Sequence, residues 1–455
     1  MRKCEILLGA LILSICFSVA SAASAKGEMS ENGLTPMGAE KRGNEDGSIP
    51  AWSGGLKRGA FDRGNSEYEN PFKDEQPLFV ISASTAGDFE NILTPGQREM
   101  LERYPNTFRI PVYPTHRTAG YSQRVYDAVS RNAQNASLTA GLNGAKNYEL
   151  SVPFPVLSGT PEEKAVQAII NHKTRWLGGS FRRSIVQIAP QVDGDYTPVG
   201  FEEDLAFPSE LEGSRAEDTE NMIYYFKQRI TDPPRLAGNI LLIHESLDQL
   251  EKPRSAWIYN QGQRRVRRAP NVAYDGPGTA SEGLRTSDNF DMYNGSLDKY
   301  EWRLIGKQEA FIPYNAYSLA NKSLTYEEII RPGHLNSDLL RYEKHRVWVV
   351  EGVLKEGERH IYGRRVLYID EDSWQIAMVD HYDRRGELWR YSEAHAMQYY
   401  DVPMMFYACE VIYDLKAGRY LVLGLNNEEA EGYDFSKTYR LRDFSPAALR
   451  RTGVR

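Results

Sequence analysis

The stretch RVWVVEGVLKEGERHIYGRRVLYIDEDSWQIAMVDHYDRRGELWR, residues 346–390, decides the fold. Runs rich in β-branched and aromatic residues alternate there with the polar connectors 355–358, 371–373 and 384–386. Connectors this short require successive strands to be antiparallel neighbours. The stretch therefore predicts a β-meander, not an α/β sheet.

The same pattern continues on both sides of this stretch. From residue 181 onward the hydrophobic period approaches 2, with short helical stretches near 324–330 and 335–341. Six strands are predicted in the C-terminal part: 343–354, 359–370, 374–382, 387–401, 405–414 and 419–425. We expect residues 181–455 to form one mainly antiparallel sheet.

Counting residues outward from the expected turns places aromatic and apolar side chains together on one face of this meander. We expect this face to be a concave ligand-binding wall. Its predicted ligand-binding members are Trp348, Arg365, Trp374, Ile376, Met378, Trp389 and Tyr391. Asp380, Glu393 and His395 fall on the same predicted face. In the alternative interpretation Arg365 pairs with Asp380 or Glu393 inside a packed layer. A slip of one residue in any hairpin would reverse the face of that strand.

A second conspicuous stretch is RSAWIYNQGQRRVRRAPNVAYDG, residues 254–276. A strand with period 2 sends Arg264 and Arg268 to one face and Arg265 and Arg267 to the other, so neither face is apolar. Two interpretations remain: a charged strand that protects a sheet edge, or a contact with an anionic head group or a partner protein.

The N-terminus resembles a cleaved secretory signal. Arg2 and Lys3 precede an apolar run, and small residues end the segment 1–22. A lipid anchor on Cys16 is the competing possibility. Cleavage leaves Cys409 as the one cysteine, predicted to be buried and inert, so no internal disulfide can form.

Cleavage also changes the formal net charge from −7 to −8, because two cations and one anion (Arg2, Lys3, Glu5) leave with the signal. This balance argues against a nucleic-acid binder. No later apolar run is long enough to span a membrane, so we expect no transmembrane segment in the mature chain.

Residues 23–77 are rich in glycine, proline and charge, which predicts an extended arm anchored at Leu34, Ile49, Trp52 and Leu56. Residues 78–180 form a helical and extended region expected to pack on the sheet. Thr94, Pro95 and Gln97 give a capping box for one helix, residues 122–135 a second, and 161–177 the most amphipathic one.

Catalytic and phosphate-binding motifs of adequate specificity are missing from the sequence. In the expected register His360 and His381 both flank Tyr362 on the face opposite the aromatic wall, where a metal pair is one interpretation. Strand histidines are more often surface or hydrogen-bonded residues, and we predict no metal and no cofactor.

Six stretches resemble a bacterial family of secreted proteins that carries only a domain-of-unknown-function label: 34–56, 112–121, 256–275, 291–302, 312–317 and 346–390. That family is similar in fold to the lipoprotein carrier LolA and the acceptor LolB. The resemblance implies an open antiparallel half-barrel covered by helices, here an α+β fold with an additional N-terminal arm. It also implies association with an exporter of the resistance-nodulation-division type and an outer-membrane protein.

Three functions follow as hypotheses. The leading one is a periplasmic binding or shuttle protein for a hydrophobic ligand such as a lipid or an acyl chain, with no enzymatic activity. The second is a structural adaptor between an exporter and an outer-membrane component. The third is an enzyme acting on a lipid or glycan, with Asp380 or Glu393 as acid or base and His395 nearby.

Overall fold

The computed structural model describes residues 29, 31–56, 68–215, 220–269, 272 and 274–453. The predicted signal peptide 1–22, with its alternative lipid anchor Cys16, lies outside these residues. Sixteen strands of the described chain form one sheet, in which the path β1-β2-β12-β13-β14-β15-β16-β17-β5-β6-β7-β8-β9-β10 runs from end to end. β11 pairs with β12 outside this path, and β18 pairs with β5.

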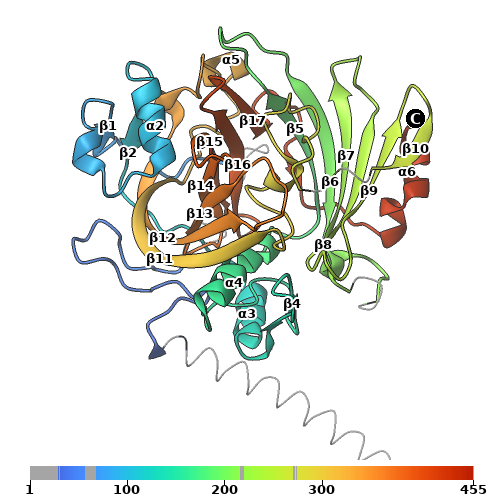
Figure 1. The fold of residues 1–455 in the computed structure, drawn as a ribbon, viewed down its shortest axis with the longest axis horizontal. Coiled ribbons are helices and arrows are strands. Elements are labelled where there is room, and N and C mark those ends of the chain that lie inside the picture. Colours follow the sequence, from blue (N-terminus) through green and yellow to red (C-terminus); the bar gives the residue numbers. More distant parts are fainter. Residues whose placement is uncertain are drawn as a thin grey trace, which may run out of the picture.

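The sheet is open, because β1 and β10 end its path. In Figure 1, β1 and β2 lie at one end of the molecule, while β10 and the C-terminal helix α6 lie at the other. All described pairings between named strands are antiparallel except the one between β2 and β12. The expected α+β fold, an open and mainly antiparallel half-barrel with an N-terminal arm, is confirmed.

The strands have the following bounds: β1 Phe79–Ile81, β2 Ile110–Val112, β3 Ser137–Leu138, β4 Ala145–Lys146, β5 Phe181–Ile188, β6 Val199–Ala206, β7 Met222–Asp232, β8 Ile240–Ser246, β9 Ser255–Asn260, β10 Arg265–Arg268, β11 Tyr300–Pro313, β12 Tyr342–Leu354, β13 Arg364–Asp370, β14 Ile376–Tyr382, β15 Leu388–Tyr399, β16 Met404–Asp414, β17 Arg419–Leu425 and β18 Tyr433–Asp434. The six predicted C-terminal strands correspond to β12–β17, and their order along the sheet is the predicted meander. The β3–β4 pair forms a separate small sheet.

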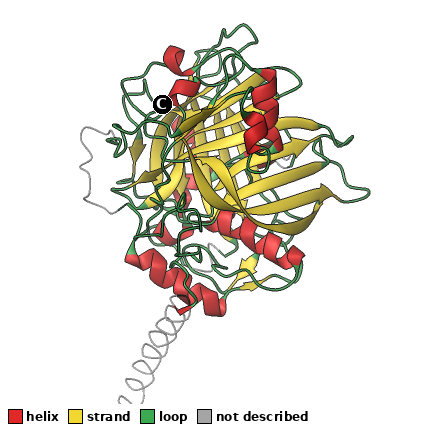
Figure 2. Ribbon diagram, turned by 90° about the vertical axis from the view of Figure 1, so that its left-hand side faces the viewer, coloured by secondary structure: helices red, strands yellow, loops and turns green. Residues whose placement is uncertain are grey.

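Helices lie against both faces of the curved strand layer, as Figure 2 shows. α2 packs with the core of one face, and α3 and α4 pack with the core of the other. The α-helices are α2 Pro95–Arg103, α3 Gln123–Asn135, α4 Pro161–Thr174, α5 Tyr326–Ile329 and α6 Pro446–Gly453; the 3-10 helices are η1 Ala86–Phe89, η2 Pro208–Glu210, η4 Ser287–Asn289, η5 Ser337–Leu339 and η6 Leu441–Phe444. The predicted capping box of Thr94 and Gln97 begins α2.

The predicted single aromatic wall is wrong, because a β-bulge divides it. Tyr368 lies opposite Met378, whereas the next residue, Ile369, lies opposite Ile376, so Ala377 is an extra residue on β14. Ile376 therefore faces the α4 side of the sheet and Met378 faces the α2 side. A bulge of one residue has the same effect on side-chain direction as a register slip.

The bulge divides the residues of the predicted wall between the two faces of the sheet. Trp348 and Trp374 belong with Ile376 on the α4 side, and Tyr391 belongs with Met378 on the α2 side. A second register shift, between His381 and Tyr382, leaves Trp389 as the extra residue of β15. The predicted apolar face with embedded charges is therefore two separate packed layers.

The arm residues 29–56 and 68–77 lie against the body of the protein. Ile49 is buried, the Trp52 indole N–H donates to the carbonyl of Ala119, and the Leu56 amide donates to the carbonyl of Thr118. Met37, which was not a predicted anchor, is buried in the α4-side core. Anchoring at spaced positions is thus the observed arrangement over the described part of the arm.

Candidate functional site

An apolar cavity of about 280 Å³ lies between the outer half of the sheet and the described residues 272 and 274–294 of the chain segment that crosses it. Such a volume is at the small end of the range for small-molecule pockets. β7, β8 and β9 form its floor, and the crossing segment forms its other wall. The lining residues are Tyr224, Phe226, Gln228, Ile230, Asn239, Ile240, Leu241, Ile243, Arg254, Ile258, Val272, Pro277, Gly278, Thr279, Arg285, Ser287, Phe290 and Asn294.

The strand register explains how the sequence builds this floor. Gln228 lies opposite Leu241, Leu241 opposite Ile258, and Ile258 opposite Arg267, so these four form one cross-strand row on one face. Phe226 and Ile243 form the neighbouring row. Ile258 is 41% exposed, which marks the open side of the cavity.

Two arginines lie in the cavity wall in different electrostatic states. Arg254 is neutralised, because its Nε lies 2.7 Å from Glu245 Oε2 and its two Nη atoms donate to the carbonyls of Val272 and Asn294. Arg285 is 93% buried, and its guanidinium makes no hydrogen bond or ion pair with any residue that the structure describes. Burial lowers the pKa of Arg285.

The acidic groups near Arg285 do not compensate its charge at neutral pH. Burial raises the pKa of Glu410 to about 8, so this carboxyl is mostly protonated at pH 7. Glu203 is already paired, because its Oε2 lies 2.6 Å from Nε of Arg183. The cavity therefore presents one cationic group in a mainly apolar lining.

The predicted arginine stretch forms the β9–β10 hairpin at the edge of the sheet. Arg265 and Arg267 lie opposite Asn260 and Ile258, on the cavity face, whereas Arg268 lies opposite Trp257 on the other face. Arg264 is in the turn with φ of 50°. All four arginines are exposed, and the described chain offers them no ion-pair partner. Their position at a sheet edge agrees with the edge-protecting interpretation.

The seven residues of the predicted wall do not line this cavity. Trp374, Ile376, Met378 and Tyr391 are fully buried in the two cores. Trp348 and Trp389 are partly buried, and the indole N–H of Trp389 donates to the carboxylate of Asp414.

The predicted partner of Arg365 is also wrong. Its Nη2 lies 2.7 Å from Oδ2 of Asp288, a residue of the crossing segment, because Asp380 and Glu393 point to the opposite face of the sheet. Nε2 of His360 donates to the same carboxylate oxygen of Asp288 at 3.1 Å, and both His360 and His381 lie beside the Tyr362 ring. The predicted face is wrong for His381, because it lies opposite the predicted wall residue Arg365 and shares its face. A guanidinium next to His360 disfavours a bound cation there.

The candidate acid and base residues Asp380, Glu393 and His395 are fully buried on the α2 side, away from the cavity. Asp380 accepts hydrogen bonds from the Gly96 amide and the Tyr368 hydroxyl, both at 3.0 Å, and burial raises its pKa to about 7. Tyr342 and Tyr391 donate their hydroxyls to Glu393. This arrangement gives a substrate no access to these groups.

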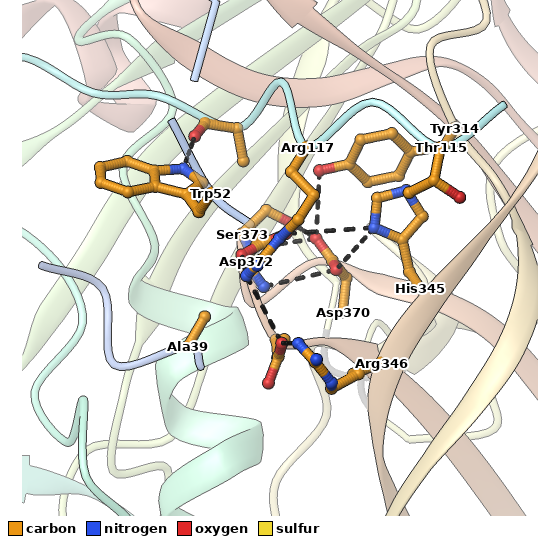
Figure 3. Close-up of polar contacts among 12 residues, drawn as sticks. Ala39, Trp52, Thr115, Arg117, Tyr314, His345, Arg346, Asp370, Asp372 and Ser373 are labelled. Atoms are coloured by element: carbon orange, nitrogen blue, oxygen red, sulfur yellow. Dashed lines mark hydrogen bonds and ion pairs between the residues drawn. The ribbon is translucent and has the colours of Figure 1, made fainter. Parts of the chain in front are cut away.

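A buried charged cluster lies where the arm meets the β13–β14 turn (Figure 3). Nε and Nη2 of Arg117 donate to the two carboxylate oxygens of Asp372, at 2.8 and 2.6 Å. His345, Asp370 and Asp372 together have the donor types and spacing of a metal site. Because Arg117 already neutralises Asp372, we interpret the cluster as an internal ion-pair network.

Comparison with known proteins identifies the family. Residues 80–450 match the family described as "Protein of unknown function (DUF1329)". The chain belongs to the DUF1329 family. The predicted membership of a domain-of-unknown-function family is thereby confirmed. The uncharacterized protein PA3922 of Pseudomonas aeruginosa is 52% identical over 460 residues, which cover the whole of both chains.

Solved structures give more distant similarities. A DUF1329 family protein from Desulfovibrio piger is 13% identical, with 64% of this chain and 100% of that chain covered and a TM-score of 0.44. A LolA superfamily protein from Nitrosomonas europaea is 13% identical, with 63% and 98% covered and a TM-score of 0.35. Among the described residues of this DUF1329 member, no helix has the length and hydrophobicity to cross a membrane.

The sequence of this DUF1329 member did not predict the cavity, although one of its lining strands has a recognisable sequence pattern. From Phe226 to Ile230, buried residues alternate along β7 with the partly buried Lys227 and Arg229, which is the period of a half-buried strand. Nothing local distinguishes Arg285 from other loop arginines, because its isolation arises only when the crossing segment folds onto β7 and β8.

Proposed function

We propose that this protein binds a hydrophobic ligand in the cavity between β7–β9 and residues 272–294, as a carrier or binding protein of the periplasm. The observation that supports the proposal is the mainly apolar lining of the cavity around Arg285, whose Nε has no hydrogen-bond partner in the described chain. Burying each methylene group of a ligand there contributes about 0.8 kcal/mol.

The proposed location rests on the secretory-signal pattern of residues 1–22. Cooperation with an envelope exporter and an outer-membrane protein remains part of the proposal. The exposed arginines of the β9–β10 hairpin would serve as the contact with such a partner or with anionic lipid.

Native mass spectrometry of the mature protein, purified from its own compartment, tests the proposal. We expect a bound acyl or similar amphiphilic species that organic extraction removes. The variant Leu241→Trp should lose this species, because Leu241 lies in the middle of the cavity floor and the larger ring fills the space.

Leu78→Trp is the matched control, because Leu78 is 65% exposed and precedes β1 at the opposite end of the sheet. This control should keep the ligand. If the wild-type protein carries no ligand and binds no added fatty acid or fatty alcohol, the proposed function is wrong.

A further inference from the structure

Arg285 is the most unusual polar group of the cavity. A guanidinium carries five N–H donors and stays charged in proteins, so burial without an acceptor is costly. Arg285 is 93% buried in the cavity wall, and its Nε has no hydrogen-bond partner in the described chain. The strongest acidic influence on it is the buried carboxyl of Glu410. Buried polar groups in proteins are nearly always satisfied, so a molecule bound in the cavity would supply the acceptor that Nε of Arg285 lacks.

The surroundings of Arg285 define the charge of that molecule. Glu203 is neutralised by Arg183, and Arg254 is neutralised by Glu245. Burial raises the pKa of Glu410, the other acidic group near Arg285, which favours its neutral form. An anion beside Arg285 would therefore meet its positive charge, and the described lining offers no second unpaired cation. A planar guanidinium matches a carboxylate through two parallel hydrogen bonds.

The remaining lining defines the rest of the molecule. Phe226, Ile230, Leu241 and Ile243 offer only apolar side chains. A cavity of about 280 Å³ equals roughly nine water molecules at their volume in the liquid, which suits one acyl chain of moderate length.

We propose that the cavity binds a single-chain carboxylate amphiphile, with its carboxylate on Arg285 and its chain along the β7–β9 floor. This inference rests on the proposed function, because it specifies the ligand of the same cavity. It assigns the head group to the buried Arg285 and not to the exposed Arg265 and Arg267 at the rim.

Isothermal titration calorimetry at pH 7 tests the assignment with three probes: decanoate, decan-1-ol and decyl phosphate. We expect the wild-type protein to bind decanoate about tenfold to a hundredfold more tightly than decan-1-ol, the range for a charge-assisted hydrogen-bonded pair. Arg285→Met should weaken the binding of decanoate by a similar factor and change the affinity for decan-1-ol by less than about threefold. The wild-type comparison does not depend on how well the variant folds.

Arg267→Met is the matched control, because Arg267 is exposed on the same face and next to Ile258 at the cavity edge. This variant should change the affinity for decanoate by less than about threefold. Because Arg267 is exposed, raised salt concentration should remove the remaining difference. Equal binding of decanoate and decan-1-ol, or a larger loss in Arg267→Met than in Arg285→Met, would overturn the head-group assignment but leave the hydrophobic cavity in place.

Two other outcomes have distinct meanings. Tighter binding of decyl phosphate than of decanoate would replace the carboxylate with a phosphate head group and overturn the proposed ligand class. Failure of all three probes to bind would contradict the proposed function itself, and the assignment with it.

Discussion

The indole N–H of Trp374 donates a hydrogen bond of 2.9 Å to the backbone carbonyl of Met37, 337 residues earlier in the chain. Trp374 ends the β13–β14 turn with φ of 61°, and its ring is fully buried. The bond fixes the arm on this turn, and Arg117 reinforces it by donating to the carbonyl of Glu40. The described part of the arm is therefore part of the folded core, and we expect its deletion to destabilise the protein.

Replacing Trp374 with Phe should destabilise the protein by about 1–3 kcal/mol, because the buried carbonyl of Met37 loses its donor. Trp348→Phe is the control, since the Trp348 indole N–H makes no hydrogen bond within the described chain. Its ring lies under the Lys307 ammonium at 4.4 Å, so its replacement should cost less than about 1 kcal/mol. Urea unfolding of both variants measures the difference, and equal losses would contradict the anchoring role.

Arg117→Met should cost about 3–5 kcal/mol, because it leaves the buried carboxylate of Asp372 without its counter-ion. The double variant Arg117→Met/Asp372→Leu should recover a substantial part of this loss, since the unpaired charge is then absent. Thermal and urea unfolding of the two single variants and the double variant test this coupling. Additive losses would show that the pair is not coupled.

An exposed pair provides the comparison for this cluster. Arg109 Nη2 lies 2.6 Å from Asp338 Oδ1, as close as the Arg117 pair, but the two side chains are 47% and 73% exposed. Water screens that pair, so Arg109→Met should change the free energy of unfolding by less than about 1 kcal/mol.

The sequence was sufficient to predict the strands of the meander, because short polar connectors and alternating apolar residues are local signals. It was not sufficient to predict which side chains share a face of the sheet, because Ala377 has no property that reveals a bulge. An extra residue on one strand depends on how the neighbouring strand is held, which is not encoded within a window of ten residues.

The candidate site was harder to predict for a related reason. The arginines of the β9–β10 hairpin attract notice because they are adjacent in the sequence, yet they are exposed at a sheet edge. Arg285 draws no attention as a single arginine, and its isolation depends on distant residues: Glu203 paired with Arg183, and Glu245 paired with Arg254.

Gly96, in the first turn of α2, should not tolerate alanine. A Cβ there would lie 2.1 Å from Cδ2 of Tyr391 and 2.5 Å from Oδ1 of Asp380. Helix propensity alone would favour alanine by about 1 kcal/mol, whereas overpacking costs about 1–3 kcal/mol, so we expect a net loss. Gly87→Ala is the control, since no atom lies within 4 Å of its Cβ position. A stabilised Gly96→Ala variant would contradict the close packing of α2 on β15.

Asp380 should make the protein less stable as the pH rises from about 4 to 7. Burial raises its pKa from 3.8 to about 7, so in this window the folded state keeps a proton that the unfolded state releases. Stability that is present below pH 3.8 is therefore lost as the pH rises toward 7, at about 1.4 kcal/mol per pH unit.

Asp380→Asn removes this titration but keeps an acceptor for the Gly96 amide. The stability of the variant relative to the wild type should therefore increase by about 1.4 kcal/mol per pH unit between pH 4 and 7, as measured by urea unfolding at each pH. Asp434→Asn is the control, because hydrogen bonds from Ser436 lower the pKa of Asp434 from 3.8 to about 2. Asp434 is therefore ionised in the folded state throughout this window and in both states above about pH 5, so the control should show no slope there. Parallel curves for wild type and Asp380→Asn would show that Asp380 is already ionised in the folded protein at pH 4.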